Sequence, residues 1–311
     1  MLKLVPRREP SRLFQYLTPL LALGLTLLAG FVMFAMLGKD PLRALGLIFI
    51  TPLTSIRGLS EITVKATPLI LIATGLAIGF RAGIWNIGAE GQFTIGAAAG
   101  GAVAIAMHPN DAFWLLPAMC FAGMIGGMAW AAIPALFKSR FNANEILVSL
   151  MLVYVATLLL SYLVHGVLKD PKSFGFPESV LFQDSAQLPR FMTSTRAHIG
   201  FLVAILAVVV AHVVMTRHRF GFEVRVHGEA PDAARFAGIA EKRMIWTTFM
   251  ISGALAGLAG LFEAAGPVGQ LVPALPVGYG FTAIIVAFLG RLAPFGILLA
   301  GLLLALTYIG G

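Results

Sequence analysis

Charged residues are scarce in this sequence. Asp, Glu, Lys and Arg make up 12% of its 311 residues, 59% are hydrophobic, and the mean hydropathy is +0.90. A soluble domain is about 25% charged and about 45–50% apolar. The composition therefore excludes a soluble globular protein. The formal charge of +8 does not indicate nucleic-acid binding either, because that requires a basic soluble face.

Residues for catalysis and metal binding are also few. The one cysteine, Cys120, lies inside an apolar run, which excludes a disulfide framework and favours a packing role. The six histidines lack metal-site spacing such as H-E-x-x-H. The Gly-Lys pair at 38–39 is not part of a G-x-x-x-x-G-K-[ST] loop, and G-x-S-x-G does not occur. We therefore predict no catalytic residue, no metal and no cofactor bound by this chain.

Long apolar runs are what the sequence does contain. A helix needs about 17 to 25 apolar residues to cross about 30 Å of hydrocarbon, and lipid cannot satisfy the polar groups of an open backbone. We therefore predict an all-α, polytopic membrane protein in which 1–311 form a single domain. Its spans, about nine in number, are predicted at residues 13–37, 61–80, 92–107, 112–137, 145–168, 198–215, 244–265, 279–290 and 295–309.

The distribution of Lys and Arg indicates the orientation of these spans. Four basic residues precede the first span, and cytoplasmic loops carry the excess of basic residues. The N-terminus is therefore expected in the cytoplasm, together with the loop 217–244. The Pro-rich, polar segment 169–197 is then expected outside, where it either contacts a delivery protein or caps the bundle.

The loop 217–244 contains signals for a short helix. Pro231 suits the first turn, Asp232 and Arg235 match the two ends of the helix dipole, and Gly238 stops the helix. A helix of about two turns is marginal by itself in water. It is therefore expected to lie on the membrane surface or to dock into another protein, and an ordinary connector is the alternative. Close docking is favoured by the small residues Ala230, Ala233, Ala234 and Ala237.

The stretch GFRAGIWNIGAEGQF, residues 79–93, places polar groups between two apolar runs. A charge at membrane depth costs about 2.5 to 3.5 kcal/mol, so Glu90 is expected to face a cavity, to pair with Arg81 or to lie at the cytoplasmic edge. The glycines favour a broken helix, and transporters bind polar solutes at broken helices. The alternative is that Glu90 and Asn86 only cap helix ends. The prediction is a lining or gating element of a solute pathway, formed by Trp85, Asn86, Glu90 and Gln92.

Three further residues are weaker candidates. Tyr279 and Phe281 are suited to stacking on a nucleobase, although aromatic residues are also common anchors at membrane edges. Glu263 closes a predicted span and is expected to be a solvated end residue. A self-sufficient secondary transporter with Glu90 or Glu263 as its proton site would not need a helix within 228–239.

Residues 228–239, GEAPDAARFAGI, resemble the cytoplasmic coupling loop of ATP-binding-cassette importer permeases of the sugar and nucleoside branch. WNIGAEGQ at 85–92 resembles a signature of the same family. The segment 38–55 is most similar to guanosine and general nucleoside uptake permeases, and simple-sugar permeases come second. His227 and Ala230 depart from the family pattern, in which Val and Asn are expected. The chain ends at LTYIGG where relatives continue, so it is either a natural short form or a truncated one.

The resemblance implies a permease subunit that imports a nucleoside by alternating access, with a pentose or hexose permease as the alternative. Relatives have about ten spans, and we expect discontinuous or re-entrant helices among them. The implied setting is a bacterial inner membrane. The implied partners are a separate ATPase subunit that uses the ATP, a second permease subunit, a substrate-binding lipoprotein or periplasmic protein, and membrane lipid. The residues implied in contact with the ATPase are Gly228, Glu229, Pro231, Asp232, Ala233, Ala234, Arg235 and Gly238.

Overall fold

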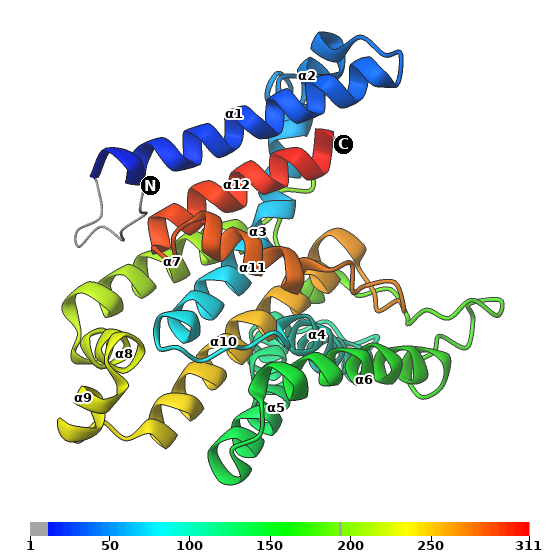
Figure 1. Cartoon of the computed structure of the whole chain (residues 1–311). Helices are drawn as coiled ribbons and strands as arrows, with labels where there is room; N and C mark the ends of the chain where they lie inside the picture. The colour runs from blue at the N-terminus through cyan, green and yellow to red at the C-terminus, as the bar shows by residue number, and fades with distance from the viewer. Residues whose placement is uncertain (1–11, 193–194, 311) are drawn as a thin grey trace, which may run out of the picture. The chain divides into compact units, whose positions relative to one another are not determined.

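The computed structural model describes residues 12–192 and 195–310 (Figure 1). Within these ranges the chain is helical and has no β-strand, and an isolated antiparallel bridge joins Arg190 and His198. This confirms the predicted all-α class. The helices are α1 (Arg12–Met36), α2 (Pro41–Phe49), α3 (Ile56–Arg81), α4 (Ala89–Met107), α5 (Leu115–Phe141), α6 (Glu145–His165), α7 (Gly200–Arg217), α8 (Arg219–Glu229), α9 (Pro231–Phe236), α10 (Glu241–Glu263), α11 (Tyr279–Leu289) and α12 (Pro294–Gly310).

Each of the predicted spans coincides with one of these helices to within a few residues at its ends. Among the described residues, five helices are both long enough and apolar enough to cross a membrane, namely α3, α5, α6, α7 and α10 with its π-helical extension. The helices α1, α11 and α12 are apolar over shorter runs. The total number of spans therefore stays a prediction. Two helices, α2 and α8, were not predicted from the sequence, and α8 lies within the predicted loop 217–244.

By its internal contacts the chain divides into two compact units, one formed by the residues up to Leu59 with those from Leu306 onward, and the other by Ser60–Ala305. In the first unit a tight turn joins α1 to α2. Gly38 takes a φ of +67°, which glycine adopts without strain. Asp40 then caps α2 by accepting hydrogen bonds from two backbone N–H groups of its first turn. The single domain stays a prediction.

Glycines allow α4, α5 and α10 to pack closely in the second unit. A side chain on Gly96 of α4 would overlap the backbone of Gly257 in α10, and one on Gly127 of α5 would overlap the backbone of Gly253. Small residues let helix backbones approach one another in membrane proteins. Of the five long apolar helices α3 and α10 are the most enclosed, with 89% and 67% of their apolar windows buried, so polar residues within these windows, such as Thr67, Thr74 and Ser252, lie inside the unit.

The sequence predicted discontinuous helices without placing one here, and the chain between α10 and α12 is discontinuous. After α10 a π-helical turn, Ala264–Val268, ends at Gly269, whose φ is +77°, and irregular chain continues to Gly278, whose φ is +91°. The helix α11 then has 11 residues, which span about 16 Å, roughly half the hydrocarbon thickness of a membrane. It is therefore a half-helix whose N-terminus lies inside the second unit, since Tyr279 is fully buried.

Candidate functional site

The predicted break in the 79–93 stretch lies between α3 and α4. The helix α3 ends at Arg81, Gly83 takes a φ of +72°, and the backbone N–H of Ile84 donates a 2.9 Å hydrogen bond back to the carbonyl of Gly79. Residues 82–88 are thus a tight, non-helical connection, which we call the α3–α4 loop.

A pair of buried amides fixes this loop to its surroundings. Asn86 Nδ2 donates to Gln92 Oε1 at 2.9 Å, and Gln92 Nε2 donates back to Asn86 Oδ1 at 3.1 Å. Asn86 Nδ2 also donates to Ser252 Oγ of α10 at 2.9 Å, and Asn86 Oδ1 accepts from the N–H of Gly88 at 3.0 Å. The two predicted amides therefore satisfy each other and join the loop to α4 and α10. Whether they also meet a solute stays a prediction.

Glu90 connects the starts of two helices. It lies in the first turn of α4, and its carboxylate accepts hydrogen bonds from the backbone N–H of Gly278, at 2.8 Å, and from that of Gly280. These N–H groups open α11, which has no side-chain cap of its own. A carboxylate is favoured there because helix N-termini carry free donors and a positive dipole end. The carboxylate is bonded to this backbone and not to Arg81. This geometry is that of a helix cap, and the pathway role stays a prediction.

The three aromatic candidates lie in different surroundings. Trp85 is partly exposed. Its ring is stacked on that of Phe288 of α11, with centroids 5.8 Å apart, and tilted against that of Phe80 of α3, with centroids 5.1 Å apart. Phe281, near the start of α11, is also partly exposed. Tyr279 is fully buried, and its ring lies 5.8 Å from that of Phe93. In this conformation, therefore, Trp85 and Phe281 present some surface, whereas Tyr279 presents none.

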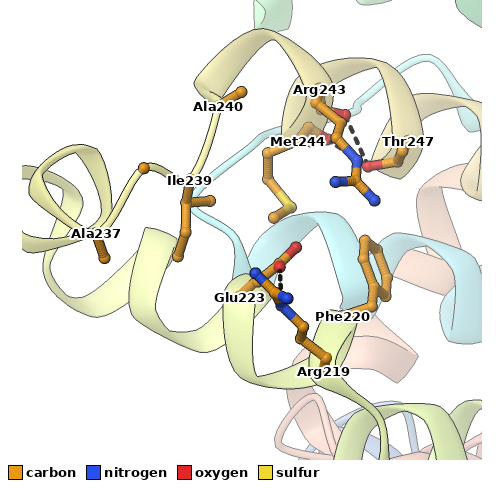
Figure 2. A pocket seen from close by; sticks show the side chains of 10 residues that line it. Arg219, Phe220, Glu223, Ala237, Ile239, Ala240, Arg243, Met244 and Thr247 are labelled. Carbon is orange, nitrogen blue, oxygen red and sulfur yellow. Dashed lines mark hydrogen bonds and ion pairs between the residues drawn. The ribbon is translucent and has the colours of Figure 1, made fainter.

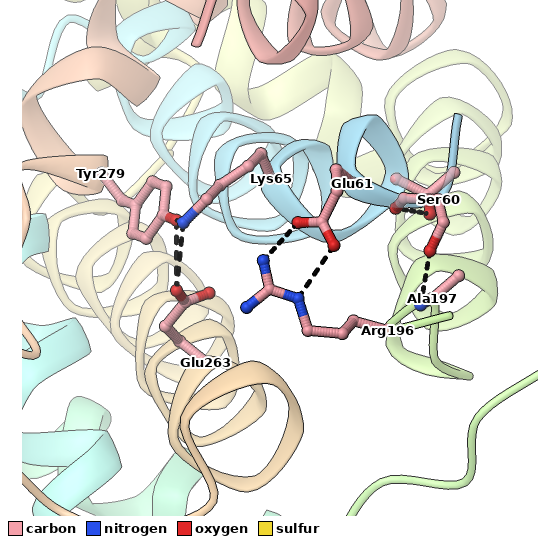
Figure 3. A network of polar contacts seen from close by, with 8 residues as sticks. Ser60, Glu61, Lys65, Arg196, Ala197, Glu263 and Tyr279 are labelled. Atoms are coloured by element: carbon pink, nitrogen blue, oxygen red, sulfur yellow. Dashed lines mark hydrogen bonds and ion pairs between the residues drawn. The ribbon is translucent and has the colours of Figure 1, made fainter. Parts of the chain in front are cut away.

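The expectation that Glu263 is a solvated end residue is wrong. Its exposed fraction is 6%, and Glu263 Oε1 accepts a 3.2 Å hydrogen bond from the hydroxyl of Tyr279 and lies 3.6 Å from Lys65 Nζ (Figure 3). Lys65 Nζ in turn donates to the hydroxyl of Tyr279 at 2.6 Å. The irregular chain after α10 turns back and places Tyr279, the first residue of α11, against the Glu263 carboxylate.

A second ion pair lies one turn before Lys65 on α3. Arg196, in the segment before α7, donates from Nε to Glu61 Oε1 at 2.8 Å, and its Nη2 bonds the other carboxylate oxygen (Figure 3). The hydrogen bond with Glu61 raises the pKa of Arg196. The N–H of Ala197 donates to Ser60 Oγ at 2.9 Å and fixes the same segment to α3.

The described parts of the segment 169–199 contact the chain that follows α10. Backbone N–H groups of Ser179 and Leu188 donate to the carbonyls of Leu271 and Ala265, at 3.0 and 2.9 Å. The imidazole of His198 is buried, accepts a 3.2 Å hydrogen bond from the N–H of Gly200, and has its pKa lowered to about 4 by burial, with a smaller contribution from the positive charge of Arg190. This packing fits the capping role predicted for 169–197, and contact with a delivery protein stays a prediction.

A short helix occupies the place predicted from Pro231 and Asp232. It is α9, Pro231–Phe236, and Gly238 follows with a φ of +78°. Arg235 lies 3.0 Å from Glu241 and 4.0 Å from Asp232.

The predicted docking residues on this segment differ in exposure. Ala233 and Glu229 are exposed, whereas Ala234 is fully buried against this chain, so it is not available to a partner. The phenyl ring of Phe236, which the sequence did not single out, is 97% exposed. A cavity of about 100 Å³ lies next to Gly238, between the first turns of α8 and α10 (Figure 2).

The helix α8, which the sequence did not predict, precedes α9 in the chain and contacts the end of α3. His227 Nδ1 donates a 2.7 Å hydrogen bond to the carbonyl of Ala82, and a Cβ on Gly228 would overlap the carbonyl oxygen of Arg81. Val224 anchors the helix in a core cluster with residues of α3, α5, α7 and α10. The α8–α9 segment therefore contacts the chain where the α3–α4 loop begins, through a histidine that departs from the family pattern.

The family model and the similar proteins that match this chain all describe permease components of transport systems. The family model described as "Branched-chain amino acid transport system / permease component" matches residues 58–311. The glucose ABC transporter permease protein TsgB13 of Haloferax volcanii is 41% identical, over 100% of this chain and 84% of that protein. The guanosine ABC transporter permease protein NupP of Bacillus subtilis is 33% identical, over 96% and 86%. The nucleoside ABC transporter permease protein NupB of Lactococcus lactis is 27% identical, over 94% and 83%. No solved structure matches significantly.

Proposed function

Because the chain belongs to the family of branched-chain amino acid transport system permease components, we propose that it is the membrane permease subunit of an ATP-binding-cassette importer for a nucleoside or a sugar. The resemblance of 38–55 to nucleoside uptake permeases favours a nucleoside. The 41% identity to a glucose permease favours a sugar as the second candidate. In either case the ATP is used by a separate ATPase subunit, and the solute comes from a binding lipoprotein or a periplasmic binding protein. A second permease chain completes the pathway.

The observation that carries the proposed mechanism is the contact of α8 with the end of α3. We place α8 and α9 in the cytoplasm with the N-terminus, and the 169–197 segment outside. An ATPase that docks on Gly228, Glu229, Pro231, Asp232, Ala233, Arg235 and Gly238 would move α9 when it closes on ATP. The hydrogen bond from His227 to Ala82 and the close approach of Gly228 to Arg81 pass this motion to the α3–α4 loop.

Glu90 links the loop to the half-helix in this mechanism. Asn86 and Glu90 are four positions apart in the sequence, and the Glu90 carboxylate holds the N-terminus of α11. A shift of the α3–α4 loop therefore displaces the end of a half-helix inside the bundle, where transporters bind polar solutes. In this mechanism the contact has two conformational states, and the ATPase shifts the equilibrium between them. Alternating access follows from that shift. Trp85 and Phe281 supply partly exposed aromatic surface beside the loop and α11.

Reconstitution tests the proposal. The chain is purified with the subunits encoded next to it, placed in liposomes, and supplied with guanosine or D-glucose and the delivery protein. Stimulation of ATP hydrolysis, with uptake that depends on ATP, supports the proposal, and the solute that stimulates identifies the substrate class. Uptake that follows a proton gradient and survives ATP depletion would overturn it in favour of a secondary transporter.

A further inference from the structure

Five polar side chains from four parts of the second unit meet in one place. They lie on α3, on the segment before α7, at the end of α10 and at the start of α11 (Figure 3). The helix spacing of four residues puts Glu61 and Lys65 on one face of α3. We call the set the polar cluster; its members are Glu61, Lys65, Arg196, Glu263 and Tyr279.

The exposed fraction of the side chains increases across the polar cluster, from a buried end to an open end. The side chain of Glu263 is 7% exposed and Tyr279 is fully buried, whereas the side chains of Lys65 and Arg196 are 28% and 53% exposed. Ionisable groups inside a helical membrane bundle are expensive, and they mark solute or ion pathways when they face the interior. A pair that only held two helices together would need no exposed end. The gradient instead gives a small polar molecule access to groups that reach into the bundle.

The charges of the polar cluster indicate what kind of molecule fits. Two carboxylates face one ammonium and one guanidinium, so the formal charges cancel. The cluster therefore has no excess charge that would pair with an ionic solute. Donors and acceptors alternate instead. The Tyr279 hydroxyl accepts from Lys65 and donates to Glu263, so it serves as acceptor and donor at once. A solute hydroxyl can likewise accept and donate a hydrogen bond. Two neighbouring hydroxyls on a ring can therefore donate to a carboxylate and accept from a cation at the same time.

This chemistry also matches what the substrates of the relatives have in common. One relative is a permease for glucose and another for guanosine. A hexose and a purine nucleoside differ in size and aromaticity, but both carry neighbouring hydroxyls on a sugar ring. A site that contacts only these hydroxyls can bind either solute.

We propose that the polar cluster is a contact site for the ring hydroxyls of the transported solute, with Lys65 and Arg196 as donors and Glu61 and Glu263 as acceptors. The proposal rests on the proposed import function and names the part of the solute that this chain recognises. It assigns Glu61, Lys65, Arg196 and Glu263 to the solute pathway.

The test compares solutes that differ only in their hydroxyls. Uptake into liposomes is measured for guanosine and 2′,3′-dideoxyguanosine, and for D-glucose and 2-deoxy-D-glucose, with delivery protein that direct binding shows to be loaded with each. All permease variants receive the same delivery protein, so its own selectivity cancels between them. The readout is the ratio of parent to deoxy uptake.

The wild-type complex should prefer the carried parent solute, and Lys65→Met should lower that ratio by about tenfold, since a lost hydrogen bond to a charged group is worth about 1.5 kcal/mol or more. Lys65→Arg keeps a donor and should keep most of the ratio. The matched control is Lys138→Met, which removes an ion pair of 3.0 Å with Glu145 between α5 and α6 and should leave the ratio unchanged. If Lys65→Met does not assemble with the ATPase, Glu61→Gln, whose carboxylate pairs with the exposed Arg196, provides the same test.

An unchanged ratio in both Lys65→Met and Glu61→Gln, with assembled complexes, overturns the inference, and so does equal uptake of parent and deoxy solutes by the wild type. Failure of the proposed function gives a different result. In that case neither guanosine nor D-glucose stimulates ATP hydrolysis by the wild-type complex, and any uptake of either solute survives ATP depletion.

Discussion

The contact between Gly228 and Arg81 provides the sharpest test of how α8 transmits motion. The Cα of Gly228 lies so close to the end of α3 that an added Cβ would overlap the Arg81 carbonyl oxygen, which is backbone and cannot move aside as a side chain does. Overpacking of this kind costs about 1 to 3 kcal/mol. Replacing glycine by alanine within a helix returns about 1 kcal/mol. Gly228→Ala should therefore weaken this contact by up to about 2 kcal/mol, which is roughly thirtyfold in an equilibrium constant.

We expect solute uptake to be uncoupled from ATP hydrolysis while the permease stays assembled with the ATPase. α8 stays anchored through Val224, and every proposed docking residue except Gly228 is unchanged, so Gly228→Ala should still copurify with the ATPase. The number of solute molecules imported per ATP hydrolysed should fall by about fivefold or more, which is the lower end of typical coupling free energies. The assay measures uptake and hydrolysis in the same proteoliposomes.

Two comparisons make the result specific to this contact. Gly46→Ala, in α2, adds the same methyl group where no atom lies within 4 Å, and should leave the ratio unchanged. His227→Leu, which loses the donor to the Ala82 carbonyl, should uncouple as Gly228→Ala does, whereas His227→Asn keeps an N–H donor near the Nδ1 position and should restore coupling. A wild-type ratio in both Gly228→Ala and His227→Leu would refute transmission through the end of α3.

Three further predictions concern other parts of the second unit. Glu90→Gln should leave the protein folded and assembled while uptake falls by about tenfold, on the order of 1.4 kcal/mol; loss of folding in a thermal melt would instead assign Glu90 to helix capping alone. Gly238→Val places a β-branched residue at a φ of +78°, which costs about 1 to 2 kcal/mol, so copurification with the ATPase should drop while membrane insertion is retained; undiminished copurification would exclude this turn from docking. His198 has a folded pKa of about 4, below the 6.5 of its unfolded state, so the unfolded chain binds the proton first and the free energy of unfolding should fall by about 3 kcal/mol as the pH drops from 6.5 to 4. Melting temperatures across that range check this, and His198→Asn, which keeps an acceptor for the Gly200 N–H, should show a smaller fall.

Local patterns determined the helices of this protein. An apolar run long enough to cross a membrane must be helical in lipid, so the long predicted ranges coincide with helices whatever their neighbours are, and the shorter apolar ranges are helical as well. The same holds for α9 and for Gly238, because a proline at a helix start and a glycine at its end act through their own backbone angles. α8 was missed for the corresponding reason. Its sequence, RFGFEVRVHGE, is neither apolar nor rich in strong helix formers, and the packing of Val224 supports it.

The partners of the polar groups were decided only by the tertiary structure. Glu90 and the N–H groups that it caps lie 188 and 190 positions apart in the sequence, and the residue counted as a departure from the family pattern, His227, bonds a carbonyl 145 positions away. Glu263 was expected in solvent because a helix end usually is. It is buried because the chain after α10 turns at Gly269 and brings Tyr279 against it, and because Lys65 of α3 lies 3.6 Å from its carboxylate. Hydropathy and helix propensity are properties of short segments, whereas the burial and pairing of a charge depend on which segments fold back together.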